Sequence, residues 1–248
     1  TMTNTAIITT ASLMFGGVAY ADDSDWDIQD RHASTSRFRA TFDEGTWMSV
    51  DVSPDGETIV FDLLGDLFVL PIAGGEAEAI SEGAAWDQDP RWSPDGTQLM
   101  YVSDRGGNQE IWIRDMESGE STQLTEGEPE RFAEATWAPD GQHIVARKRI
   151  TDTRSIGMCE LWMFDLTGGD GVQLTETGDL AFPLEPVYSN DGEWLYYTAA
   201  PSRFAYNKDP NSAIYNLYAK ELTSGEVRRL TGEAGSAFRP TVNPVTGQ

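Results

Sequence analysis

Few side chains in this sequence have a type and spacing that could carry out catalysis. The 248 residues include two histidines, His32 and His143, and one cysteine, Cys159. No His-x-His, His-Glu-x-x-His or paired-cysteine pattern occurs, so a zinc or binuclear metal centre of the usual composition cannot be assembled. The Gly-x-Ser-x-Gly turn that exposes a nucleophilic serine is also absent. We therefore expect no catalytic residue, metal site or cofactor within this chain.

The acidic residues and the single cysteine point to no specific site either. Asp152 and the pair Asp87 and Asp89 leave calcium binding open, but no segment matches the twelve-residue calcium loop. Solvated carboxylates are the simpler interpretation. Cys159 can form no internal disulfide and precedes a strand of large apolar residues, which predicts a buried thiol.

One cluster of positive charge stands out from this acidic background. Arg147-Lys148-Arg149 and Arg154 place four of the 17 basic residues within a short segment. Salt bridges to neighbouring acidic residues are one explanation. The other is a docking patch for a further domain or an anionic group, because arginine makes planar two-point contacts with carboxylates. With two residues of a later loop, the candidate binding residues are Arg147, Lys148, Arg149, Arg154, Arg203 and Tyr206.

A fourfold repeat must position these side chains. Each copy opens with a tight turn: Ser53-Pro54-Asp55-Gly56, Ser93-Pro94-Asp95-Gly96, Ala138-Pro139-Asp140-Gly141 and Ser189-Asn190-Asp191-Gly192. Each closes, at a constant spacing from an apolar strand, on an aliphatic-hydroxyl pair: Ile80-Ser81, Leu124-Thr125, Leu174-Thr175 and Leu230-Thr231. Proline and glycine suit a reversal between antiparallel strands, and a period of roughly 40–50 residues indicates four-stranded propeller blades. The predicted fold is therefore an all-β propeller, with tyrosine and tryptophan packing between blades.

The copies differ chiefly in the loop between their second and third strands. This loop lengthens from the first copy to the fourth, and the two longest examples span about residues 149–158 and 199–214. In a propeller these loops emerge on the face opposite the Ser-Pro-Asp-Gly turns. Long loops on one face of a rigid scaffold are where binding commonly occurs.

The two ends of the chain suggest an incomplete ring. Residues 37–42 resemble an outermost strand that would complete the last blade, and residues 239–244 begin a fifth blade. We expect four complete blades and part of a fifth, from a ring of six or seven. The expected organisation is a secretory signal at 1–21, a linker at 22–36 and an incomplete propeller at 37–248.

Charge and the N-terminal segment restrict the setting in which the protein acts. A net charge of -24 repels phosphate backbones, which argues against nucleic-acid binding. The first 21 residues carry no charge, and an apolar run at 6–18 leads into Ala19-Tyr20-Ala21. This pattern is typical of an export signal cleaved near Ala21, and the run is too short to span a bilayer. We expect a periplasmic or secreted protein without a membrane span in the mature chain.

The repeat resembles the TolB-like, WD-type propeller family over residues 41–248. A narrower resemblance is to exported bacterial amidohydrolase-family proteins, carried by Asp43-Glu44-Gly45-Thr46-Trp47-Met48, Leu64-Gly65-Asp66-Leu67, Pro71-Ile72-Ala73-Gly74-Gly75-Glu76-Ala77, Ala85-Trp86-Asp87, Ala146-Arg147-Lys148 and Glu160-Leu161-Trp162. That resemblance implies a non-catalytic propeller that shields or positions a metal-dependent hydrolase domain whose ligands lie beyond Gln248. Its expected partner is that downstream catalytic domain.

Two alternatives remain open. The first is the gating propeller of a serine peptidase that resembles prolyl oligopeptidase. The second is a free-standing periplasmic interaction module whose partner is another protein. A histidine-rich metal motif after the propeller would favour the amidohydrolase hypothesis, and a nucleophilic serine turn would favour the peptidase.

Overall fold

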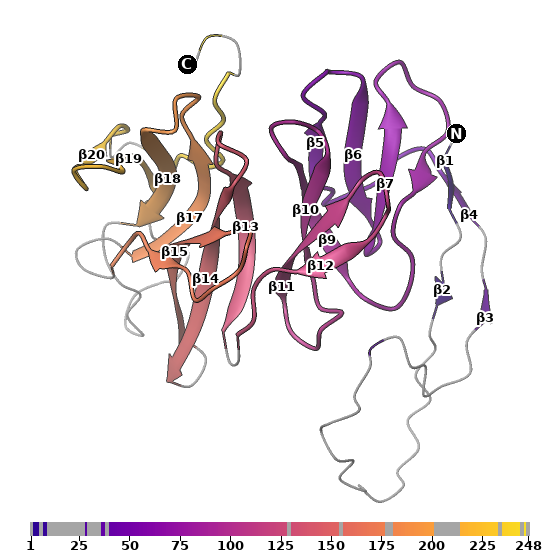
Figure 1. Cartoon of the computed structure of the whole chain (residues 1–248), viewed down its shortest axis with the longest axis horizontal. Coiled ribbons are helices and arrows are strands. Elements are labelled where there is room, and N and C mark those ends of the chain that lie inside the picture. The colour runs from indigo at the N-terminus through magenta and orange to yellow at the C-terminus, as the bar shows by residue number, and fades with distance from the viewer. Residues whose placement is uncertain are drawn as a thin grey trace, which may run out of the picture.

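The computed structural model describes residues 2–4, 7–8, 28, 36–37, 40–127, 130–153, 156–176, 181–200, 214–232, 235–243 and 246. Within these ranges the chain forms four antiparallel four-stranded sheets that follow one another in sequence order (Figure 1). The innermost strand of each sheet contacts the innermost strand of the next. Each sheet is thus a propeller blade, and the predicted all-β fold with four complete blades is confirmed. These described ranges contain no helix capable of crossing a bilayer.

Strands run from the inner to the outer edge of each blade in chain order. The first blade contains β5 (Val50–Val52), β6 (Thr58–Leu63), β7 (Asp66–Pro71) and β8 (Glu78–Ala79). The second contains β9 (Asp87–Trp92), β10 (Gln98–Ser103), β11 (Glu110–Asp115) and β12 (Ser121–Gln123). The third contains β13 (Arg131–Trp137), β14 (His143–Thr153), β15 (Ile156–Asp165) and β16 (Val172–Gln173). The fourth contains β17 (Ala181–Tyr188), β18 (Trp194–Ala200), β19 (Asn216–Glu221) and β20 (Val227–Arg229).

The N-terminal strands pair differently from the prediction for residues 37–42. β4 (Ala40–Phe42) pairs with β1 (Met2–Asn4), and β3 (Ser36–Arg37) pairs with β2 (Ile7–Ile8). Segments close in sequence can pair at small entropic cost, whereas completing a last blade requires a partner sheet far along the chain. The signal and linker assignments stay predictions.

The predicted turns form as their residue types require. In the first blade the amide of Gly56 donates to the carbonyl of Ser53 at 2.8 Å, and Gly56 has a φ of 74°. The Ser53 hydroxyl accepts the Thr58 amide at 2.9 Å and donates to Asp55 Oδ1. The bond from the Ser53 hydroxyl lowers the pKa of the Asp55 carboxyl. The serine, aspartate and glycine side-chain and backbone bonds thus stabilise the tight turn between two antiparallel strands. The turns that begin at Ser93 and Ser189 contain the same side-chain bonds.

The hydroxyl that closes each repeat holds the outer strand against the third strand. The residues Ser81, Thr125, Thr175 and Thr231 each accept a backbone amide at 2.9 Å, from Leu67, Ile111, Leu161 and Leu217 respectively. In the second blade the Thr125 hydroxyl also donates to Glu110 Oε2 at 2.6 Å. In the third blade Thr175 makes the same bond to Glu160. We call each arrangement a closing latch, and it explains the constant spacing of the aliphatic-hydroxyl pairs.

Most of the hydrophobic core lies between blades, and a smaller cluster of Phe61, Leu63 and Phe68 lies within the first blade. Val60 and Leu67 of the first blade pack with Leu99 and Tyr101 of the second. The next cluster joins the second blade to Phe132, Trp137 and Phe164 of the third, and the following one joins the third blade to Tyr188, Tyr197 and Tyr218. The predicted packing of aromatic residues between blades is confirmed at these positions. Trp47 and Trp86 are exceptions, since both are exposed.

Candidate functional site

Three residues of the basic cluster lie on a strand and not in a loop. Arg147, Lys148 and Arg149 belong to β14, which pairs with β15 along an extended hairpin that reaches Thr153 and Ile156 (Figure 1). The prediction of a loop at 149–158 is therefore wrong. Ile150, Thr151 and Thr153 are β-branched and favour a strand, which is the sequence signal that identifies this extension. Of the other predicted loop, residues 201–213 lie outside the described part of the chain.

Two of the three central basic residues are paired with acidic side chains of the same blade. Arg147 Nη2 lies 3.0 Å from Glu134 Oε1, and both side chains are about three-quarters buried. Lys148 Nζ lies 3.7 Å from Glu130 Oε1 and 4.6 Å from the centre of the Trp162 ring. Arg149 is exposed. These contacts are the salt bridges that one of the two explanations of the cluster requires.

The remaining candidate binding residues cannot be placed beside this cluster. Arg154, Arg203 and Tyr206 lie outside the described residues. Their role in binding, and that of Arg147, Lys148 and Arg149, stays a prediction.

A bulge in the inner strands is the main polar feature that sequence analysis missed. Asp89, Glu134 and Glu185 occupy the same place in β9, β13 and β17, with φ values of 52°, 48° and 54°. The strand register shifts beside each of them. Arg239, at the corresponding place after the fourth blade, has a φ of 55°. In the sequence, Asp89, Glu185 and Arg239 are each followed by proline, and this pattern could have predicted the bulges. Proline has no backbone N–H to donate to a neighbouring strand, so it is tolerated at bulges.

Carboxylates join these bulges from one blade to the next. Asp62 accepts the Ser49 amide at Oδ1 and the Asp89 amide at Oδ2, both at 2.9 Å. Glu134 Oε2 accepts the Glu185 amide at 2.9 Å, and Glu185 Oε2 accepts the Arg239 amide at 2.6 Å. Burial raises the pKa of the Asp62 and Glu134 carboxyls. We call Asp62, Glu134 and Glu185 the bulge carboxylates.

The reactive residue types are held in non-reactive settings. Cys159 is 3 % exposed, as predicted, and burial raises the pKa of its thiol to about 12, so it does not ionise at neutral pH. His143 Nδ1 lies 2.7 Å from Asp140 Oδ2 at the surface. Among the described residues, no three His, Cys, Asp or Glu side chains are arranged to hold a metal ion. The bulge carboxylates thus bind backbone amides, and neither Cys159 nor His143 is arranged as a nucleophile.

Replacing Arg147 with Ala is expected to lower the free energy of unfolding by about 1 kcal/mol, because Glu134 loses its partner in a pair that is about three-quarters buried. Arg149→Ala is the matched control, since its exposed side chain should change stability by less than about 0.5 kcal/mol. Urea unfolding measured by tryptophan fluorescence gives both values. Equal losses for the two variants would contradict the assigned ion pair.

Comparisons with known proteins identify the fold family. A family model described as the TolB beta propeller domain matches residues 27–159. The chain is 29% identical over 165 residues to the uncharacterized peptidase YuxL of Bacillus subtilis, covering 66% of this chain and 21% of that protein. It is 33% identical over 89 residues to tricorn protease homolog 1 of Streptomyces coelicolor, covering 36% of this chain and 8% of that protein. It thus spans about a fifth of the first relative and less than a tenth of the second.

A solved structure agrees with the family match. The putative TolB of Agrobacterium tumefaciens superposes with a TM-score of 0.59 and 21% identity, covering 78% of this chain and 69% of that one. With its repeated turns, closing latches and inter-blade cores, this chain belongs to the TolB beta propeller domain family.

Proposed function

We propose that this chain is the propeller portion of a longer serine peptidase, in which it controls the access of substrate to a catalytic domain outside the chain. The observation that carries the proposal is the similarity to two curated proteins named as peptidases, each far longer than the matched region. This was one of the alternatives left open by the sequence. The amidohydrolase hypothesis receives no support from these relatives.

The architecture suits a gating role. Inter-blade cores and closing latches make a rigid scaffold, while the β14–β15 hairpin extends from the face opposite the Ser-Pro-Asp-Gly turns. A rigid propeller with an elaborated face can select substrates by size without supplying a reactive group. Export to the periplasm or medium is part of the proposal and is supported by the apolar segment at 6–18.

The proposal is tested on the full-length protein that contains this chain. We expect a fluorophosphonate probe, which reacts with activated serines, to label it and to abolish hydrolysis of end-blocked peptide amides. We also expect EDTA to leave hydrolysis unchanged. Hydrolysis that EDTA abolishes, without labelling, would overturn the proposal in favour of the amidohydrolase hypothesis. Absence of both labelling and hydrolysis would overturn it in favour of an interaction module.

A further inference from the structure

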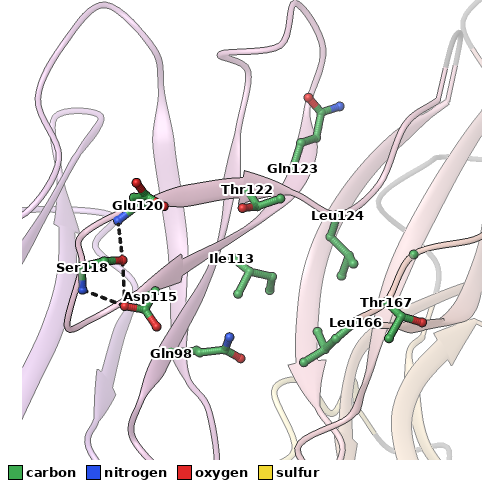
Figure 2. A pocket seen from close by; sticks show the side chains of 11 residues that line it. Gln98, Ile113, Asp115, Ser118, Glu120, Thr122, Gln123, Leu124, Leu166 and Thr167 are labelled. Atoms are coloured by element: carbon green, nitrogen blue, oxygen red, sulfur yellow. Dashed lines mark hydrogen bonds between the residues drawn. The ribbon is translucent and has the colours of Figure 1, made fainter.

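A groove of about 620 Å³ opens on the outer side of the seam between the second and third blades. Figure 2 shows Ile113, Leu124 and Leu166 directed into this space from the two blades, with Gln98 and Thr122 beside them. Its lining residues are Gln98, Ile113, Asp115, Ser118, Glu120, Thr122, Gln123, Leu124, Leu166, Thr167 and Gly168. We call it the seam groove.

Short branched side chains face each other across the seam at this opening. Ile113 of β11 and Leu166, which follows β15, are both short branched residues packed against the inter-blade core. The corresponding pairs in the two neighbouring seams are Val69 with Met116 and Met163 with Leu222. Each of those pairs includes a methionine, whose long unbranched side chain fills irregular gaps. The second seam has none at these positions.

The seam groove combines an apolar floor with an acidic rim. Ile113, Leu124 and Leu166 form the floor, and Asp115 and Glu120 lie at the rim. No lysine or arginine of the described chain forms an ion pair with either rim carboxylate.

Local hydrogen bonds fix the rim carboxylate at Asp115. Its Oδ1 accepts the Ser118 amide at 2.7 Å and the Ser118 hydroxyl at 2.8 Å (Figure 2). These bonds lower the pKa of Asp115, which is therefore an anion at neutral pH. Gly168, on the opposite wall, has no side chain to obstruct a ligand, and a Cβ there would meet no atom within 4 Å.

We propose that the seam groove binds an extended peptide segment in which an apolar side chain is followed by lysine or arginine. The apolar side chain enters between Ile113, Leu124 and Leu166, and the cation pairs with Asp115 and Glu120. The net charge of -24 attracts a basic segment at longer range and disfavours an acidic one. This inference does not rest on the proposed peptidase activity, because binding here requires no catalytic group.

The test uses fluorescein-labelled hexapeptides, blocked at both ends, that contain a central Leu-Lys or Leu-Glu pair. Their binding to the full-length protein is followed by fluorescence anisotropy after fluorophosphonate treatment, so that a hydrolytic site does not contribute. We expect the Leu-Lys peptide to bind about fivefold more tightly at low salt, since an exposed ion pair contributes modestly. Equal affinity for the two peptides, or no binding of either, would overturn the proposal.

Two variants and two matched controls locate the binding. Thr122 is exposed on β12 and lines the groove, so Thr122→Trp should fill it and weaken binding at least about tenfold. Val172→Trp, at the corresponding exposed place on β16, should change affinity by less than about twofold. The second pair of variants tests the charge at the rim. Asp115→Asn keeps an acceptor for Ser118 but removes the negative charge, and it should weaken binding about fivefold. Asp165→Asn, the equivalent change in the third blade, should have no effect.

The controls also separate this proposal from the peptidase proposal. Equal loss of binding in Thr122→Trp and Val172→Trp would place the peptide elsewhere and overturn the seam groove as its site. Hydrolysis and labelling would be unaffected by that outcome. Conversely, a protein that is neither labelled nor hydrolytic could still bind the Leu-Lys peptide through Thr122 and Asp115.

Discussion

Replacing Thr125 with Val is expected to lower the free energy of unfolding by about 3 kcal/mol at about pH 8. The Thr125 hydroxyl accepts the Ile111 amide at 2.9 Å and donates to Glu110 Oε2 at 2.6 Å. Thr125 and Glu110 are each 2 % exposed. Valine keeps the shape of threonine but leaves a buried amide and a buried carboxylate without this partner. Each such group costs about 1–3 kcal/mol, with charged groups at the upper end.

Thr231→Val is the matched control in the fourth blade. Its hydroxyl also accepts a backbone amide at 2.9 Å, but the neighbouring side chain is the neutral Asn216. We expect a loss of about 1 kcal/mol, because no charged group is left without a partner. Urea unfolding measures both losses, provided that the slope of the unfolding free energy against urea concentration is the same in the variants and the unchanged protein. Similar losses for the two variants would show that Glu110 contributes nothing to the latch.

Raising the pH from about 5 to about 8.5 is expected to lower the free energy of unfolding by about 2 kcal/mol. Burial raises the pKa of the Glu110 and Asp66 carboxyls to about 7, and for Asp66 the neighbouring Asp87 and Glu82 add to this effect. In the unfolded chain both groups have a pKa near about 4, so the folded protein holds their protons more tightly. Their stabilising effect is therefore complete below about pH 4 and is lost as the pH rises through about 7.

Glu110→Gln tests the origin of this pH dependence. Glutamine stays neutral and can still accept hydrogen bonds from Thr125 and Gly127, so stability at about pH 8.5 should rise by about 1–2 kcal/mol and the pH slope should flatten. Asp95→Asn is the control, because the local bonds of its turn lower the pKa of Asp95 and place its titration below this pH range. Thermal or urea unfolding between about pH 5 and about pH 8.5 measures this pH dependence. If the stability of Glu110→Gln fell with pH as steeply as that of the unchanged protein, Glu110 would be excluded as the source of the pH dependence.

The repeated turns and closing pairs predicted the blades because each is encoded by a few adjacent residues. Ser53 to Gly56 and Leu124 to Thr125 carry their own structural requirements, and the structure contains both. The hairpin at 149–158 was predicted as a loop because repeat spacing measures the length of an insertion and not its conformation. The bulge at Glu134 has no following proline to mark it, and its bond to the Glu185 amide joins two blades, which no single repeat encodes.

The candidate sites were less predictable than the blades for a related reason. Arg147 and Lys148 were predicted as binding residues because positive charges cluster in that part of the sequence. Their acidic partners are distant in sequence: Glu134 lies on the neighbouring strand β13, and Glu130 directly precedes that strand. The seam groove is lined by Ile113 and Leu166, which come from two different blades. That these two residues face each other is visible in the sequence only after the register of both blades is known.

Three of the four backbone amides that donate to the bulge carboxylates lie later in the chain than their acceptor, the exception being Ser49, and this direction suits vectorial synthesis. In the bonds from Asp89 to Asp62, from Glu185 to Glu134 and from Arg239 to Glu185, the donor lies later in the chain than the acceptor. A strand that leaves the ribosome therefore meets an acceptor that the preceding blade has already placed. Nascent blades can be added one at a time in the order of translation, and the growing chain need not wait for ring closure to provide acceptors for these bulge amides.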